Sequence, residues 1–167
     1  MNASKDTQTG TSFGPRRIHI EKERQRLMLK NRLTIRIEWG DCDPAGIVFY
    51  PQYFKWFDAC AAALFTAAGF PRADLVGKQG IVIPMVDTRC KFLIPFRFDD
   101  ELTVETTITR FGRSSFDVQH KILKGADLAV ECSETRVWSR IDFTGPERLK
   151  AQSIPETVIQ ALSQDDD

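Results

Sequence analysis

The most constraining feature of this sequence is a long segment after Pro51 that has an apolar stripe on one side and few charges on the other. The apolar residues recur at i, i+3, i+4 and i+7, the spacing of one face of an α-helix; they are Tyr53, Trp56, Phe57, Cys60, Ala61, Leu64, Phe65 and Ala68. The reverse side is rich in alanine, at positions 59, 62, 63 and 67. Such a helix must be enclosed on several sides, so the rest of the chain is expected to wrap around it.

The ends of this helix are also marked in the sequence. Pro51 suits the first helical position, because its missing N–H costs nothing there. Gly69 is a natural C-terminal stop, and Pro71 prevents the helix from continuing. A helix over residues 51–68 is therefore predicted.

The segments around the helix have the pattern of strands. Apolar and polar residues alternate over residues 33–37, which predicts a strand that ends at Gly40. Four strand-like runs follow the helix, at residues 81–92, 102–111, 116–123 and 127–141, and a short terminal helix is expected at 154–162. Pro84 indicates an edge or a bulge, and the last run is long enough to need a bulge. This order predicts an α+β domain in which an antiparallel sheet curls around one helix.

The length and charge distribution suggest one domain with two tails. A chain of 167 residues with 12 Phe and 3 Trp can bury a full core. The domain is expected at residues 31–150, followed by a short helix and an acidic tail at 151–167. Residues 1–30 are expected to form a basic, largely disordered arm. Its single aromatic residue, Phe13, offers no stacking platform, so neither nucleic acid nor a membrane is an expected partner.

Composition also bears on metal content and location. The four cysteines are widely spaced and form no CxxC pair, which argues against a zinc ribbon or a redox dithiol; they are Cys42, Cys60, Cys90 and Cys132. We expect reduced thiols in a cytoplasmic protein without metal or cofactor. No apolar run approaches the ~20 residues that span a bilayer, and the first 25 residues lack a signal-peptide block.

The motifs of several common enzyme classes are missing. The sequence contains no GxSxG, HExxH, GxxxxGK[ST] or GxGxxG. Of the two histidines, His19 lies in the arm and His120 falls on the apolar face of a strand, where a core role is expected. A Ser-His-Asp or Cys-His arrangement has no credible base, so acid–base chemistry must fall to a carboxylate.

The segment at residues 40–51, GDCDPAGIVFYP, has three interpretations. A calcium loop would begin at Asp41 and Asp43, but its twelfth position is Gln52 instead of a chelating carboxylate. A purely structural turn is the second interpretation, since Asp, Pro and Gly are ordinary turn residues. In the third, Asp43 is catalytic, because it precedes a helix N-terminus whose free N–H groups can bind a developing oxyanion.

The uninterrupted run from Ile37 to Tyr53 resembles the signature of the 4-hydroxybenzoyl-CoA thioesterases, a family of hotdog-fold acyl-CoA thioesterases. The resemblance covers residues 31–145. It implies that Asp43 is the catalytic carboxylate, acting as nucleophile or as base on water. It also implies that the backbone N–H of Tyr50 polarises the thioester carbonyl.

The same resemblance implies a mode of substrate binding and an assembly. The family's turn that contacts the phosphates of coenzyme A matches residues 112–115, although Gly112 and Ser114 stand where basic residues would be expected. The expected substrate-binding residues are Gly46, Arg113, Ser114 and Ser115. The family further implies a homodimer or homotetramer with the site between subunits.

Together these features suggest hydrolysis of an aromatic acyl-CoA such as 4-hydroxybenzoyl-CoA or benzoyl-CoA. A short or branched aliphatic acyl group, or a non-catalytic acyl-binding scaffold, remains an alternative. Phe49, Tyr53 and Phe92 are candidate pocket walls. Asp58 is expected to pair with an arginine, and Asp41 to shape the turn.

Overall fold

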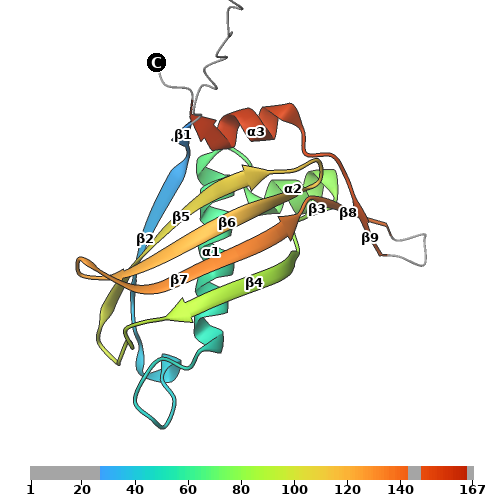
Figure 1. The fold of residues 1–167 in the computed structure, drawn as a ribbon. Helices are drawn as coiled ribbons and strands as arrows, with labels where there is room; N and C mark the ends of the chain where they lie inside the picture. The colour runs from blue at the N-terminus through green and yellow to red at the C-terminus, as the bar shows by residue number, and fades with distance from the viewer. Residues whose placement is uncertain (1–26, 143–147, 165–167) are drawn as a thin grey trace, which may run out of the picture.

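The computed structural model describes residues 27–142 and 148–164, and its central feature is helix α1 (Pro51–Ala67) lying against one face of a curled sheet (Figure 1). The strands of this sheet are β2 (Lys30–Arg36), β4 (Met85–Phe92), β5 (Glu101–Phe111), β6 (Ser115–Lys124) and β7 (Asp127–Val137). They pair antiparallel in the order β2-β5-β6-β7-β4. The α+β architecture predicted from the periodicities is confirmed.

Smaller elements surround the main sheet. A second sheet has the order β3-β8-β9 and consists of β3 (Ile81–Val82), β8 (Ser139–Ile141) and β9 (Leu149–Ala151). The remaining elements are the 3-10 helix η1 (Trp39–Asp41), α2 (Arg72–Gln79), α3 (Glu156–Leu162), and the pair of β1 (Leu27–Met28) with β10 (Ser163–Gln164). Because β1 is part of the fold, the ordered strands begin slightly before Asn31.

The core lies between α1 and the sheet in two clusters. The first surrounds the N-terminal half of α1 and includes Phe57, Phe96 and Val104. The second surrounds the C-terminal half and includes Phe65 and Trp138. The apolar stripe of α1 therefore faces the sheet as its spacing predicts.

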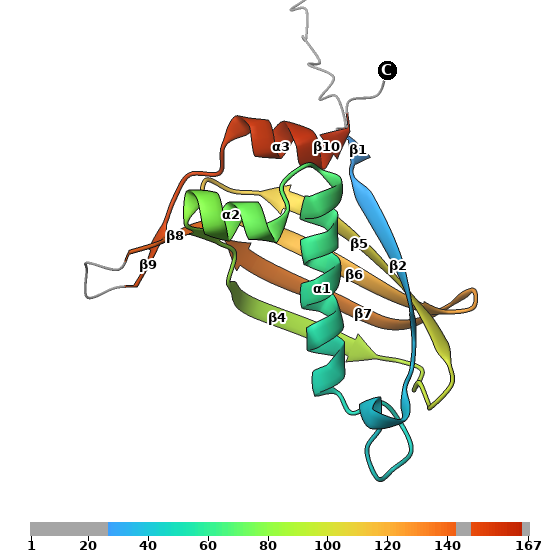
Figure 2. The ribbon, with the colours of Figure 1, turned by 180° about the vertical axis from the view of Figure 1, so that it is seen from behind.

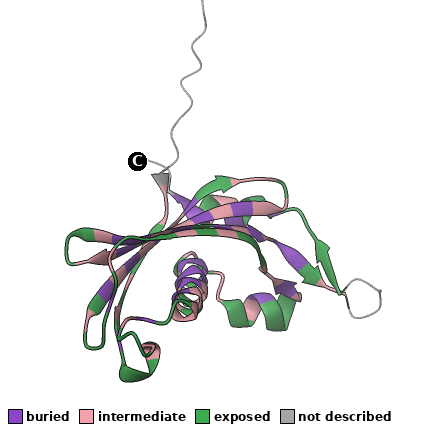
Figure 3. Cartoon of the chain, turned by 60° about the horizontal axis from the view of Figure 1, so that its bottom comes forward, coloured by how far each residue is buried: buried purple, intermediate pink, exposed green. Residues whose placement is uncertain are grey.

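The other side of α1 is less enclosed than expected. Seen along the sheet, α1 lies beneath it with α2 beside one end, and the side away from the sheet is open (Figure 3). Ala59 and Ala67 are exposed there, and Ala62 and Ala63 are only partly buried. A single curled sheet can cover only one side of a helix, so residues 27–142 and 148–164 of one chain do not supply the enclosure that the sequence predicted.

Two strand runs are divided in the structure. The run at 81–92 breaks at Ile83 and Pro84, so β3 and β4 belong to different sheets. The run at 127–141 breaks at Trp138. The chain passes from the small sheet to the main sheet at the first break and from the main sheet to the small sheet at the second. Such a change of sheet leaves no signal in local periodicity.

Helix α2 was not expected, although its signals are present in the sequence. Pro71 precedes it, Asp74 and Lys78 form an i,i+4 ion pair at 2.9 Å, and Gly80 ends it with φ of 64°. A left-handed residue after a helix is most often glycine. Figure 2 shows α2 beside the C-terminal part of α1.

The expectation that all four cysteines are reduced is wrong. Cys90 and Cys132 form a disulfide between β4 and β7, while Cys42 and Cys60 are free thiols. The register of the antiparallel ladder places Cys90 directly opposite Cys132, across a sequence separation of 42 residues. Sequence spacing does not show such a pairing.

Residues 1–26, in the predicted basic arm, and residues 165–167, in the acidic tail, lie outside the described residues. Within the described part, no single helix is long and apolar enough to cross a membrane; the bent pair of α1 and α2 meets the criterion by length and composition only.

Candidate active site

Asp43 lies in a tight loop between η1 and α1. An isolated bridge between Cys42 and Val48 closes this loop. The Oδ1 atom of Asp43 accepts a hydrogen bond from the Ala45 N–H at 2.8 Å, and the backbone N–H of Asp43 donates to the Ile47 carbonyl at 2.9 Å. Gly46 has φ of 74°, a left-handed conformation that side chains other than glycine rarely adopt. The loop therefore holds the backbone of Asp43 in one conformation.

Tyr50 follows this loop at the N-cap position of α1, with Pro51 as the first helical residue. The N–H of Phe49 donates to the Asp41 carbonyl at 2.8 Å. No acceptor is assigned to the next N–H, that of Tyr50, within residues 27–142 and 148–164. An unpaired N–H at the positive end of a helix can stabilise a developing oxyanion.

Asp41 has the structural role expected of it. Its Oδ2 accepts a hydrogen bond from the backbone N–H of Glu38 at 2.9 Å, within a reciprocal capping box at η1. The two carboxylates of the loop therefore differ. Asp41 bridges across η1, whereas Asp43 bonds the amide two residues further along its own turn and forms no ion pair with any described residue.

An apolar recess lies beside the start of α1. Its volume is about 270 Å³, and Tyr50, Tyr53, Phe92 and Leu93 contribute to its lining. The rings of Tyr53 and Phe92 are 5.1 Å apart, and burial raises the pKa of Tyr53 to about 12. Of the three candidate wall residues, Tyr53 and Phe92 line this recess, and Phe49 is exposed next to it.

The structure does not bring the expected coenzyme A turn to Asp43 within one chain. The turn at residues 112–115 joins β5 to β6, and its Gly112 N–H donates to the Ser115 carbonyl at 2.7 Å. Asp43 lies near the opposite end of β5, where Arg36 pairs with Glu101. Strand β5 has 11 residues, and the steps from its first to its last residue extend about 33 Å at about 3.3 Å per step. Arg113, Ser114 and Ser115 are therefore remote from Asp43 and Tyr50 of the same chain (Figure 1).

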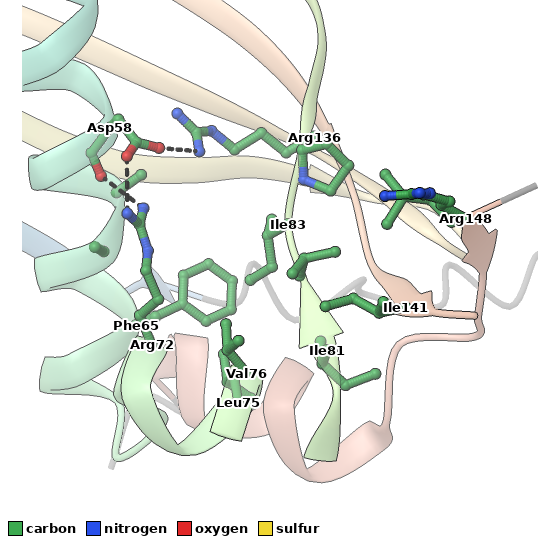
Figure 4. A pocket seen from close by; sticks show the side chains of 15 residues that line it. Asp58, Phe65, Arg72, Leu75, Val76, Ile81, Ile83, Arg136, Ile141 and Arg148 are labelled. Atoms are coloured by element: carbon green, nitrogen blue, oxygen red, sulfur yellow. Dashed lines mark hydrogen bonds and ion pairs between the residues drawn. The ribbon is translucent and has the colours of Figure 1, made fainter. Parts of the chain in front are cut away.

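A second charged site, centred on Asp58, is more elaborate than the sequence suggested. Its Oδ2 accepts from Arg72 Nη1 at 2.9 Å, and its Oδ1 accepts from Arg136 Nη1 at 3.0 Å (Figure 4). Burial alone would raise the pKa of Asp58, but the hydrogen bonds and charges of the two arginines outweigh burial and lower it. The expectation that Asp58 pairs with an arginine is confirmed.

This charged cluster continues into the core. Arg136 Nε donates to Glu134 at 2.8 Å, and Glu134 lies 3.4 Å from His120 Nε2. His120 is fully buried, shares a hydrogen bond of 2.9 Å with Thr106 through Nδ1, and stacks on Phe57, as its expected core role requires. Burial opposes ionisation of Glu134, but His120 and Arg136 together lower its pKa.

Sequence reasoning did not identify Glu134 and Arg136. A signal was nevertheless present, because alternate residues of a strand face the same side. Glu134 and Arg136 therefore lie on the same face of β7 as Cys132, whose side chain is buried. Opposite charges two residues apart on the inward face of a strand indicate a buried ion pair.

The chain matches known proteins over most of its length. Residues 45–131 match the model of the thioesterase superfamily. Over 135 residues, 77% of the chain and 94% of the relative, it is 38% identical to 4-hydroxybenzoyl-CoA thioesterase of Pseudomonas sp. (strain CBS-3). It is 27% identical to 1,4-dihydroxy-2-naphthoyl-CoA hydrolase of Synechococcus sp. (strain WH7803), covering 76% of the chain and 84% of the relative.

Solved structures agree. A mutant of 4-hydroxybenzoyl CoA thioesterase complexed with 4-hydroxybenzoyl CoA superposes with a TM-score of 0.74 at 35% identity, covering 80% of this chain and 99% of that one. A gentisyl-coenzyme A thioesterase superposes with a TM-score of 0.69 at 33% identity, covering 79% of this chain and 98% of that one.

Proposed function

The chain belongs to the thioesterase superfamily and is an acyl-CoA thioesterase of the hotdog fold, and from this premise we propose that its substrate is an aromatic acyl-CoA, with 4-hydroxybenzoyl-CoA or benzoyl-CoA as the type. The overall reaction consumes water and cleaves the bond between the acyl carbon and the sulfur. Its products are the free acid and coenzyme A. The aromatic preference is supported by the relative and the structure whose names specify 4-hydroxybenzoyl-CoA.

The observation that carries the mechanism is the N–H of Tyr50 at the start of α1, which has no acceptor among the described residues and lies in the same loop region as the carboxylate of Asp43. In the proposed reaction, the thioester oxygen accepts a hydrogen bond from this N–H, which stabilises negative charge as the carbonyl carbon is attacked. Asp43 either attacks that carbon directly or removes a proton from an attacking water. A thioester is electrophilic enough for a positioned carboxylate to suffice.

A second copy of the chain completes the proposed site. The β5–β6 turn of one chain is too far from its own Asp43 to bind the same substrate molecule, so its Arg113, Ser114 and Ser115 would serve the site of another copy. Edge strand β4 supports this assembly. Among the described strands it pairs with β7 alone, and it exposes Met85, Val86 and Phe92. An open edge strand is a surface for strand pairing, and the side of α1 that the described residues leave uncovered provides a further surface.

A thiol-release assay over a panel of coenzyme A thioesters tests this function. The panel contains 4-hydroxybenzoyl-CoA, benzoyl-CoA, butyryl-CoA and isobutyryl-CoA. We expect the two aromatic thioesters to have the highest kcat/KM. A higher kcat/KM for the aliphatic pair would move the substrate assignment to short or branched chains. Tight binding of the thioesters without thiol release would instead identify an acyl-binding scaffold.

A further inference from the structure

A larger pocket lies away from the start of α1, between α1, α2 and the small sheet. Its apolar wall comes from these three elements and from the link between β3 and β4 (Figure 4); it includes Phe65, Leu75, Val76, Ile81, Ile83 and Ile141. The catalytic proposal uses none of these side chains. The pocket is formed by residues of a single chain.

The volume of this pocket exceeds the needs of one aromatic ring. It is about 600 Å³. A protein cavity of about 150 Å³ is sufficient to bind benzene, and pockets for ligands of several rings span about 300–1,000 Å³. A benzoyl group would leave most of the space empty, so the pocket suits a hydrocarbon group of at least two fused rings or of comparable branching.

The charges around this pocket are unbalanced. Three arginines line it, namely Arg72, Arg136 and Arg148, and Asp58 is the one carboxylate among its lining residues. Arg136 also contacts Glu134 behind it, so three guanidinium groups meet two carboxylates. Asp58 is shared by Arg72 and Arg136. Within the described ranges no carboxylate pairs with Arg148, which is exposed and leaves one positive charge uncompensated.

We infer that this pocket binds an apolar ligand of two-ring size that carries an anionic group, with the hydrocarbon against the aliphatic wall and the anion on Arg148. A guanidinium beside an apolar cavity recognises a carboxylate by paired hydrogen bonds and charge. Arg72 also lines the pocket, and its charge is balanced by its ion pair with Asp58. The neutralised Asp58 does not repel the anion.

Two sources could supply this chemistry. One is a free carboxylic acid that binds as an effector or product. The other is the acyl group of a thioester made from a dicarboxylic acid, in which one carboxyl group is joined to coenzyme A and the other is free. This second source rests on the proposed function. Asp58 follows Tyr50 by eight residues, about 12 Å along the axis of α1. A thioester at Tyr50 of the same chain would need an acyl group of that length, whereas a thioester held by a second copy could approach directly.

Isothermal titration of the unmodified protein with 2-naphthoate, 2-naphthamide and benzoate tests the site. We expect 2-naphthoate to bind at least tenfold more tightly than either of the others, because 2-naphthamide lacks the charge and benzoate lacks the second ring. Equal affinities for 2-naphthoate and 2-naphthamide, or no binding of 2-naphthoate at millimolar concentration, would overturn the inference.

Three variants locate the binding. Arg148→Ala should weaken the binding of 2-naphthoate about tenfold, which corresponds to the loss of one charge-assisted hydrogen bond. It should leave the affinity for 2-naphthamide unchanged. Arg140→Ala is the matched control, because Arg140 is exposed on β8 next to Ile141 but does not line the pocket. It should leave both affinities unchanged. Val76→Trp fills the rim from α2 and should weaken both ligands. If Arg148→Ala and Arg140→Ala behave alike, Arg148 is not the anion site.

A kinetic comparison distinguishes the two sources. The mono-coenzyme A thioester of naphthalene-2,6-dicarboxylic acid is compared with 2-naphthoyl-CoA in the unmodified protein and in Arg148→Ala. A selective loss of kcat/KM for the dicarboxylic substrate identifies the pocket as an acyl site. Unchanged kcat/KM for both substrates, with lost binding of 2-naphthoate, identifies a free-acid site. Titration requires no turnover, so ligand binding in this pocket can be confirmed even if the aromatic thioesterase proposal fails. Equally, aromatic thioesterase activity can be confirmed even if the pocket binds no ligand.

Discussion

Arg136 on β7 reaches Asp58 in the middle of α1, with 3.0 Å between its Nη1 atom and the Oδ1 atom of the carboxylate. The same guanidinium donates from Nε to Glu134 at 2.8 Å. The side chains of Arg136 and Glu134 are 5% and 1% exposed. One buried cation thus joins the sheet to the helix through two carboxylates.

Replacement of Arg136 by Met should strongly destabilise the protein. It leaves Glu134 as a buried carboxylate without its arginine partner, and breaking a buried ion pair from one side typically costs about 3–5 kcal/mol. Urea unfolding at fixed protein concentration measures the free energy of unfolding. Arg110→Met is the control, because the Arg110–Asp117 pair lies on the surface, and it should cause a much smaller loss. Equal losses would show that burial of the pair does not determine its contribution.

Stability should also decrease in acid through the same cluster. The ordinary pKa values are 3.8 for Asp58 and 4.5 for Glu134, and both are lowered in the folded protein. The unfolded chain then binds protons more readily, so the contribution is complete above these values and is lost as the pH falls through the lowered ones. The melting temperature should be nearly constant from about pH 7 to 5.5 and fall below about pH 4.5. Calorimetry of Glu134→Gln should show a shallower acid decline; an unchanged slope would remove Glu134 from the explanation.

Asp43→Asn should nearly abolish thioester hydrolysis. The substitution retains the shape of the side chain and the acceptor oxygen for the Ala45 N–H but removes the charge required for attack or for proton removal. The expected loss in kcat is about 10² to 10⁴-fold, with a smaller change in KM. Asp41→Asn is the matched control, since the amide oxygen can still accept from Glu38 and activity should largely survive. An Asp43→Asn enzyme within threefold of the parent would transfer the role to another group.

Removal of residues 1–26 should leave both the fold and the hydrolytic activity intact, because the resemblance to thioesterases begins after this segment. Removal of residues 1–28 is a more demanding truncation. It eliminates β1, whose Met28 pairs with Ser163, and should lower the melting temperature. Circular dichroism and the thiol-release assay distinguish the two. Lost turnover in a folded protein lacking residues 1–26 would place the arm in the catalytic site.

The protein should form a dimer or tetramer in solution, with β4 at the interface. Light scattering should report two or four times the chain mass of 19.0 kDa. Val86→Lys places a charge on the exposed face of β4 and should shift the distribution towards smaller species. Thr34→Lys, exposed on the opposite edge strand β2, should not. A parent protein of 19.0 kDa at assay concentration would remove the proposed shared site.

Several features could be predicted from local sequence alone. The spacing of apolar residues after Pro51 predicts α1, and the alternation at residues 33–37 predicts β2, because side-chain direction within one element depends only on its period. Turn chemistry at Asp41 and Gly46 also acts over a few residues. The candidate catalytic pair, Asp43 and Tyr50, is seven positions apart in the sequence and joined by one loop. Local reasoning suggested Asp43 beside a helix N-terminus as one of three interpretations, and the resemblance to the thioesterase family added the role of the Tyr50 N–H.

Only the tertiary structure decided which distant residues meet. The register between β4 and β7 places Cys90 opposite Cys132, and the packing of α1 on the sheet brings Arg136 to Asp58 across 78 residues. The length of β5 separates Arg113 from Asp43. These relationships depend on strand register, sheet order and the curvature that closes the sheet over the helix. Such quantities are set by the packing of the whole core, to which each local pattern contributes only one surface.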